Sequence, residues 1–120
     1  MDSGLFDYTT AFSRNIGWVT EAEQHSLAGK RVAIAGMGGV GGFHLLTLAR
    51  LGVQHFHIAD LDEFELANFN RQAGASMGNL GRHKAEALAE MALEINPQAD
   101  IKLFHDGVTQ GNLAEFFKKV

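Results

Sequence analysis

A run of glycines constrains the fold of this chain more than any other feature. Five glycines in seven positions follow directly on the apolar segment 31–35 and precede an apolar helical segment: Gly36, Gly38, Gly39, Gly41 and Gly42. The spacing Gly-x-Gly-x-x-Gly after a strand provides a tight turn and lets the backbone approach a phosphate closely. The free N–H groups and the positive dipole end of the next helix favour an anion. The loop therefore predicts a nucleotide-binding site.

Strand and helix patterns alternate along the rest of the chain. A capping box formed by Thr20 and Glu23 predicts the start of a helix that stops near Gly29. Periodicity and turn residues predict strands over 31–35, 54–59 and 100–105, helices over 40–51 and 82–95, a helical turn over 68–72, and a last helix from Thr109 toward Val120. The alternation predicts an α/β fold, a Rossmann-like parallel sheet with helices on both faces. We expect residues 1–19 to form an N-terminal arm and residues 20–120 to form the sheet domain.

Composition and charge exclude several classes of protein. With 120 residues, 46% of them hydrophobic, the chain is expected to bury a single core. The formal net charge of −4 argues against a nucleic-acid-binding surface, and the lack of cysteine excludes disulfides and thiolate zinc sites within these residues. Segment 32–49 is uncharged but holds five glycines and His44, so we expect a buried strand and helix there, not a membrane span. With no basic, apolar leader at its start, the protein is expected to be cytoplasmic.

A polar segment follows the second predicted strand. Asp60 lies at the tip of that strand, about 20 residues after the last glycine of the loop, where a carboxylate can bind ribose hydroxyls. An arginine and a lysine beside such a site could neutralise the negative charge of a triphosphate while a nucleophile attacks its α-phosphorus. Taken singly, the aspartates also suit turn or cap positions, and the basic residues suit a solvated surface. The other candidates in and after this segment are Asp62, Asn68, Arg71, Gln72 and Lys84.

These motifs resemble the ThiF/MoeB/HesA family, the bacterial relatives of ubiquitin-activating enzymes. The matching pieces lie within about residues 12–117: Gly-x-Gly-Gly-Val-Gly at 36–41, Asp60-x-Asp62, Asn68-x-x-Arg71-Gln72, Lys84-Ala85 and Ser13-Arg14-Asn15-Ile16. The resemblance implies nucleotide binding by Gly36, Gly38, Gly39, Gly41, Asp60, Asp62, Asn68, Arg71, Gln72 and Lys84. In the family pattern the loop amides face the phosphates, Asp60 binds the ribose, and Asn68, Arg71 and Lys84 line the triphosphate. Catalytic roles are implied for Arg71, for Lys84, and for Arg14, which would reach across a homodimer into the partner's site.

The resemblance also implies an activity, the ATP-dependent activation of a carboxylate by adenylation. The carboxylate is often the C-terminal glycine of a ubiquitin-like sulfur-carrier protein. In the family, an aspartate that helps hold Mg²⁺ follows a fourth strand, which these 120 residues do not contain, so we predict no metal ligand within them. We expect this nucleotide-binding part alone to bind ATP weakly and to form no acyl-adenylate. Its open apolar strand edge is expected to promote association.

Three other interpretations stay open. The glycine loop and Asp60 also suit an NAD-dependent oxidoreductase domain, which leaves residues 68–72 without a role. A non-catalytic remnant that only scaffolds or dimerises is a second interpretation. Within the family, residues 68–72 and 108–109 resemble the variant that acts as a tRNA threonylcarbamoyladenosine dehydratase, although the acidic charge disfavours tRNA. His55 and His57 share one strand face, but no third ligand accompanies them, so a metal site there is disfavoured.

Overall fold

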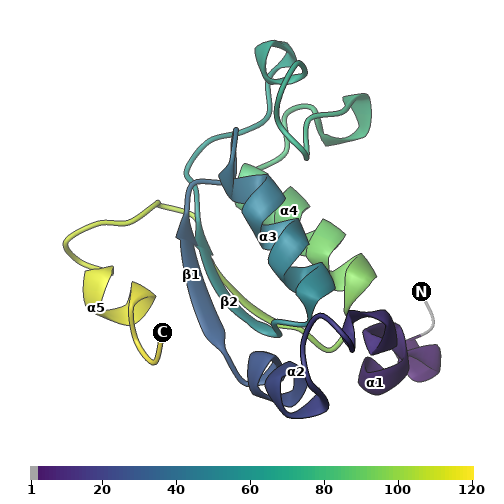
Figure 1. The fold of residues 1–120 in the computed structure, drawn as a ribbon. Coiled ribbons are helices and arrows are strands. Elements are labelled where there is room, and N and C mark those ends of the chain that lie inside the picture. The colour runs from purple at the N-terminus through teal and green to yellow at the C-terminus, as the bar shows by residue number, and fades with distance from the viewer. Residues whose placement is uncertain (1–2) are drawn as a thin grey trace.

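The three expected strands form one parallel sheet. The computed structural model describes residues 3–120 and orders the strands β1 (Arg31–Ala35), β2 (His55–Ala59) and β3 (Asp100–Phe104) as β1-β2-β3. In this register Ile34 pairs with Ile58, and Ile58 pairs with Leu103. Because all three strands are parallel, their carboxyl ends meet at one edge of the sheet (Figure 1). The predicted Rossmann-like α/β class is confirmed.

Two helices cover one face of the sheet, α3 (Gly41–Leu51) and α4 (Lys84–Ile95), and they lie side by side across it (Figure 1). Strand residues that point toward these helices alternate with residues that point away, so one set of apolar side chains enters the core. Complete burial of each large apolar side chain contributes about 1.5–3 kcal/mol. The large apolar residues that are fully buried in this layer include Leu45, Phe56, Ile58 and Leu88.

The ends of the helices follow the predicted capping chemistry. Helix α2 (Glu21–Ala28) begins with a complete capping box, in which Thr20 and Glu23 each accept a hydrogen bond from the other's backbone N–H. Helix α3 ends at Gly52, whose φ of 102° lies in the left-handed region. A side chain at Gly52 would also collide with Tyr8 and Gln24. The chain can therefore turn from α3 into β2 only with glycine at this position.

The opposite face of the sheet is covered at one end by a short helix, α5 (Leu113–Phe116) (Figure 1). Phe116 packs there on Ala59 and Phe104. The predicted sheet with helices on both faces is thus present, but α5 shields much less of its face than α3 and α4 shield of theirs.

The last helix is shorter than the sequence predicts. A helix from Thr109 toward Val120 is wrong in extent, because residues 109–112 form a turn. Asn112 Oδ1 accepts a hydrogen bond from the N–H of Thr109 at 2.7 Å, and Asn112 Nδ2 donates to the carbonyl of Gly107 at 2.7 Å. These bonds hold the backbone in a turn where the pattern suggested helix.

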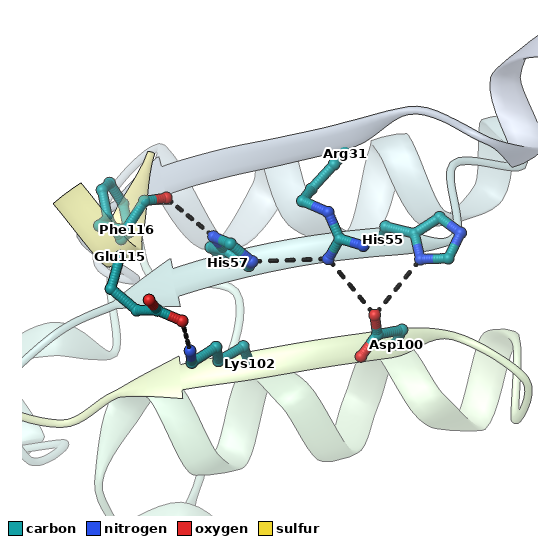
Figure 2. Close-up of polar contacts among 7 residues, drawn as sticks. All are labelled: Arg31, His55, His57, Asp100, Lys102, Glu115 and Phe116. Carbon is teal, nitrogen blue, oxygen red and sulfur yellow. Dashed lines mark hydrogen bonds and ion pairs between the residues drawn. The ribbon is translucent and has the colours of Figure 1, made fainter. Parts of the chain in front are cut away.

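The part of this face beyond α5 is polar. Figure 2 shows Arg31, His55 and Asp100 in one row across the three strands. Asp100 accepts hydrogen bonds from His55 Nδ1 at 3.4 Å and from Arg31 Nη1 at 3.3 Å. The hydrogen bond with His55, and then the bond and charge of Arg31, hold the pKa of Asp100 below its ordinary value. His57 Nδ1 lies 2.8 Å from the carbonyl oxygen of Phe116. Both histidines therefore have partners within the fold, and residues 3–120 contain no cluster of three or more potential metal ligands.

The N-terminal segment comprises η1 (Ser3–Leu5), α1 (Tyr8–Ala11) and η2 (Ser13–Asn15) and packs at the carboxyl end of α3. Tyr8 Oη donates to the carbonyl of Gly52 at 2.6 Å, and Asn15 Nδ2 donates to the carbonyl of Leu51 at 3.3 Å. The segment is therefore fastened to the domain and is not a loose terminus. Among residues 3–120, no helix combines the length and apolar content needed to cross a membrane.

Candidate functional site

The glycine loop joins β1 to α3 at the carboxyl edge of the sheet. Gly36 has a φ of 93°, and its N–H donates to the carbonyl of Ala59 at 2.7 Å. A Cβ atom at Gly41 would lie 1.7 Å from the carbonyl oxygen of Gly36, so no side chain fits there. At Gly39, by contrast, a Cβ atom would meet nothing within 4 Å. The loop thus needs two of its glycines for its own fold, whereas Gly39 faces open space.

Asp60 ties this loop to the end of β2. Its Oδ2 accepts a hydrogen bond from the N–H of Met37 at 2.7 Å, and its Oδ1 accepts one from the N–H of Asp62 at 2.8 Å. A carboxylate has about four lone-pair positions, so further acceptor capacity is left for a ligand hydroxyl. Asp60 therefore shapes the loop in this structure, and its role toward ribose stays a prediction.

The amino end of α3 has no side-chain cap. Its N-cap residue, Val40, makes no capping hydrogen bond, and the helix ladder begins with the N–H of His44 donating to the carbonyl of Val40. The first N–H groups of a helix have no partner within the helix, and they carry the positive end of its dipole. The glycine loop thus leads into a helix end that suits an anion.

Lys84 occupies the polar hollow next to this edge. The hollow has a volume of about 450 Å³, and its polar lining also includes Asp62, Glu63, Glu65, Asn68 and His83. Lys84 is only 7% exposed, and its Nζ lies 5.7 Å from the centre of the Phe64 ring. Its ammonium makes no ion pair and no hydrogen bond with any of residues 3–120, and unlike Gln72 Oε1 it is accessible from the hollow. The stem of Lys84 is therefore buried, in contrast to that of a surface lysine, and the ammonium faces the hollow.

Arg82 shows the contrast with Lys84. Arg82 Nη2 lies 2.7 Å from Glu90 Oε2 and 3.6 Å from Glu86 Oε1, and the hydrogen bond with Glu90 raises the pKa of Arg82. Its charge is thus satisfied within the fold.

Helix α4 begins at Lys84, two residues later than the pattern predicts, because the carbonyl of Arg82 accepts from the N–H of Phe64. The N–H of Lys84 itself donates to the carbonyl of Asp62 at 2.9 Å, which fixes the lysine backbone beside that residue.

The predicted motif at 68–72 lies on the 3-10 turn η3 (Leu66–Asn68) and the residues after it. Asn68 Oδ1 accepts from the N–H of Glu65 at 2.8 Å, so much of its role is local. Arg71 is exposed, and its Nη1 donates to the carbonyl of Ala67 and to Asn70 Oδ1. Arg71 does not line the hollow that contains Lys84. Gln72 lies against the glycine loop, at Gly38.

Arg14 lies far from the other candidates within the chain. It is exposed on η2, which is fastened to the carboxyl end of α3 through Asn15 and Leu51. The glycine loop precedes the opposite end of α3, and an 11-residue helix is about 16 Å long. The structure therefore does not bring Arg14 to the glycine loop of its own chain.

A second, smaller hollow of about 280 Å³ extends the site toward β3. Gly36, Asp60 and Asp62 line it together with Gly107 and Val108 of the β3–α5 connection. In the sequence Val108 stands out only through the resemblance of residues 108–109 to one family variant, and no motif indicates Gly107. The rule that ligands bind outside the carboxyl ends of parallel strands could have found both, because they follow the third strand.

Comparison with known proteins identifies the family. The model of the ThiF family matches residues 12–120. The chain belongs to the ThiF family. Among the relatives of this ThiF-family chain, the tRNA threonylcarbamoyladenosine dehydratase of Escherichia coli is 36% identical over 89 residues, which are 74% of this chain and 33% of the relative. The probable adenylyltransferase/sulfurtransferase MoeZ of Mycobacterium tuberculosis is 32% identical over 96 residues, 80% of this chain and 24% of the relative.

The fold of the family is found in solved structures as well. The crystal structure of the E. coli dehydratase TcdA in complex with ATP has a TM-score of 0.85, with 31% identity, over 90% of this chain and 44% of that one. The ThiF-family chain thus spans less than half the length of each of these relatives. The predicted membership of the family and its Rossmann-like architecture are confirmed.

Proposed function

We propose that this chain provides the ATP-binding part of an enzyme that activates a carboxylate by adenylation. The observation that carries the proposal is Lys84, whose side chain is largely buried and whose ammonium makes no ion pair with residues 3–120, in a hollow that shares Leu61 and Asp62 with the hollow at Gly36. Lysine is almost never buried unless it is paired, because removing its charge from water is costly. A bound polyphosphate would supply the missing counter-charge.

The geometry suggests how ATP would lie. The glycine loop and the uncapped amino end of α3 would receive the phosphates, with Lys84 directed toward the triphosphate. The free acceptor positions of Asp60 would bind the ribose hydroxyls, at the end of β2 where Rossmann-like folds place this carboxylate. The TcdA structures in complex with AMP and with ATP support this choice of ligand.

The reaction follows from the family. A carboxylate oxygen of the substrate attacks the α-phosphorus of ATP, the new oxygen–phosphorus bond forms, and the bond to the β-phosphate oxygen breaks to release pyrophosphate. Negative charge on the transferring and leaving groups calls for cations held in place beforehand. In this proposal Lys84 supplies one such cation, and Arg71 would have to turn away from Ala67 and Asn70 to supply another.

Mg²⁺ normally accompanies ATP in such a step. Among residues 3–120, no three potential metal ligands converge, so we assign no protein ligand to Mg²⁺ and derive no step through it. Mg²⁺ stays a predicted companion of the ATP phosphates, and a cytoplasmic location likewise stays a prediction.

The acyl substrate has two candidates. The tRNA threonylcarbamoyladenosine dehydratases of E. coli and Bacillus subtilis, 36% and 31% identical to this chain, favour a modified nucleoside in tRNA. The relative MoeZ, a probable adenylyltransferase/sulfurtransferase, favours the C-terminus of a ubiquitin-like sulfur-carrier protein. ATP–pyrophosphate exchange with the protein that contains this chain, driven in turn by modified tRNA and by carrier protein, distinguishes them.

We further propose that Arg14 acts only across a homodimer. Its position at the far end of α3 leaves it no route to the glycine loop of its own chain. A subunit carrying Arg14→Ala, mixed with a subunit carrying Gly38→Val, should then restore one site in each mixed dimer. Verified mixed dimers without any restored activity would assign Arg14 a role within one subunit.

Calorimetry with ATP, AMP and NADH tests the nucleotide assignment. We expect ATP to bind more tightly than AMP, because only ATP brings the phosphates that Lys84 would pair with, and we expect no NADH binding. Tight NADH binding would favour the oxidoreductase alternative. Absence of binding by all three ligands would favour a non-catalytic scaffold.

A further inference from the structure

Two glutamines are buried to nearly the same extent, but only one of them has a hydrogen-bonded carboxamide oxygen. Gln24 is 6% exposed and Gln72 is 8% exposed. The amide of Gln24 is fully engaged, since Nε2 donates to Tyr8 Oη at 2.9 Å and to the carbonyl of Leu51 at 2.8 Å, and Oε1 accepts from Asn15 at 3.2 Å. Gln72 Oε1, by contrast, is a buried acceptor without a hydrogen-bond partner among residues 3–120.

Unpaired buried acceptors of this kind are rare in folded proteins. Most buried polar atoms are hydrogen-bonded, and the exceptions tend to have a functional reason or a partner that joins later. A stable fold alone would be served better by an apolar side chain of the same size at this position. The unpaired carboxamide of Gln72 therefore calls for a role beyond packing.

Gln72 lies against the glycine loop at Gly38. A Cβ atom at Gly38 would lie 3.3 Å from Gln72 Nε2 and 3.5 Å from Gln72 Oε1, so the amide faces the Cα atom of Gly38. The neighbouring residue of the loop, Met37, is held by Asp60 through its N–H. The loop thus contacts both a paired carboxylate and an unpaired carboxamide.

The backbone of Gln72 is held in place, so its side chain stays at the loop. The N–H of Gln72 donates to the carbonyl of Asn68 at 3.1 Å, and the carbonyl of Gln72 accepts from the N–H of Ala75 at 3.1 Å. The adjacent residue, Arg71, extends to the surface. The backbone of Gln72 is therefore fixed, and its carboxamide can form a hydrogen bond to the loop backbone after a small shift of the side chain or of the loop.

We propose that Gln72 is a positioning residue for the phosphate-binding loop, and that its carboxamide hydrogen-bonds to the backbone around Gly38 when the loop holds a phosphate. The proposal rests on the proposed function, because it needs a polyphosphate at the loop. Gln72 acts on the phosphates through the loop and does not touch the ribose, which the proposed function assigns to Asp60. It also links phosphate binding to the segment that carries Arg71.

Gln72→Met tests the proposal, because methionine fills a similar volume and removes only the amide. We expect the affinities for ATP and for inorganic tripolyphosphate to fall about five- to tenfold, since a hydrogen bond that forms only in the bound state is lost. Adenosine affinity should not change. The thermal unfolding midpoint should stay equal or rise, because no hydrogen bond of the free protein is lost.

Gln24→Met is the matched control. It removes an amide of similar burial that is fully paired at the opposite end of α3. We expect a lower unfolding midpoint and, at a temperature where the variant is folded, unchanged affinity for tripolyphosphate. If Gln72→Met behaves like Gln24→Met, losing stability while retaining affinity, the positioning role is wrong.

A measurement on the unaltered protein avoids dependence on any variant's folding. The side-chain NH₂ signals of Gln72 in an NMR spectrum should shift, and exchange more slowly with solvent, when tripolyphosphate is added. Those of Gln24 should not change. Tripolyphosphate binding without any change at Gln72 would overturn this inference alone, whereas no binding of tripolyphosphate or ATP would overturn the proposed function itself.

Discussion

The N–H of Met37 donates to Asp60 Oδ2 at 2.7 Å, and this bond fastens the glycine loop to the end of β2. Met37 is completely buried, whereas Asp60 is half-buried, so the bond joins the core to the edge of the site. The other oxygen of the same carboxylate holds the N–H of Asp62, the first turn of the segment that leads to Lys84. A residue predicted from the sequence as a ligand contact is thus also a structural link between two parts of the site.

Replacing Asp60 should therefore affect binding and stability together. In Asp60→Asn the NH₂ group replaces one acceptor, so one of the two backbone N–H groups loses its partner. A hydrogen bond to a charged group contributes about 1.5–3 kcal/mol, and we expect the free energy of unfolding to fall by about that amount. Calorimetry should show weaker binding of ATP, AMP and adenosine alike. Asp106→Asn, at an exposed position after β3, is the control and should leave both quantities unchanged.

The loop glycines should differ sharply in their tolerance of alanine. Gly41→Ala places a Cβ atom 1.7 Å from the carbonyl oxygen of Gly36, and backbone must move to relieve it. We expect a loss of at least about 3 kcal/mol in the free energy of unfolding, measured by denaturant titration. Gly39→Ala meets nothing within 4 Å and should change that free energy by less than about 0.5 kcal/mol. Equal effects of the two substitutions would mean that the loop has a different conformation.

The polar face of the sheet predicts a pH-dependent contribution to stability. The pKa of Asp100 is lowered in the folded state by His55 and Arg31, so its ionised form stabilises the fold above the ordinary aspartate pKa. That contribution is lost as the pH falls through the lowered value. Because the side chain of Asp100 is 59% exposed, Asp100→Asn should cost at most about 1 kcal/mol at neutral pH. Denaturant titrations of both proteins should converge in strong acid, and a constant difference at every pH would contradict this account.

Much of the fold can be predicted from local signals. The capping box at Thr20 and Glu23, the glycine at position 52 and the charge pattern of α4 each favour the structure that forms. The last helix could not be predicted, because a helical pattern after Thr109 competes with side-chain bonds of Asn112 to the nearby backbone. Such short-range competition depends on geometry that periodicity does not describe.

The candidate site could be predicted in its residues but less well in their roles. The glycine spacing and Asp60 indicate the carboxyl edge of the sheet, which the parallel order of the strands confirms. The burial of Lys84 and the unpaired amide of Gln72 could not be predicted, because both depend on which side chains surround them after folding. The hydrogen bonds that hold Arg71 away from the hollow are likewise a result of tertiary structure.

The central claim is that the unpaired ammonium of Lys84 has a polyphosphate as its counter-ion, and Lys84→Met tests it most directly. Methionine retains most of the apolar stem and removes the charge, so the variant should be at least as stable as the unaltered protein, because a largely buried side chain loses an unpaired charge. Titration calorimetry at matched ionic strength should show an at least tenfold loss of ATP and tripolyphosphate affinity, an estimate from charged hydrogen bonds of about 1.5–3 kcal/mol, with adenosine affinity little changed. Arg82→Met, which removes a paired cation close by, should leave ATP affinity unchanged. Equal ATP affinity in the unaltered protein and in Lys84→Met would contradict the account.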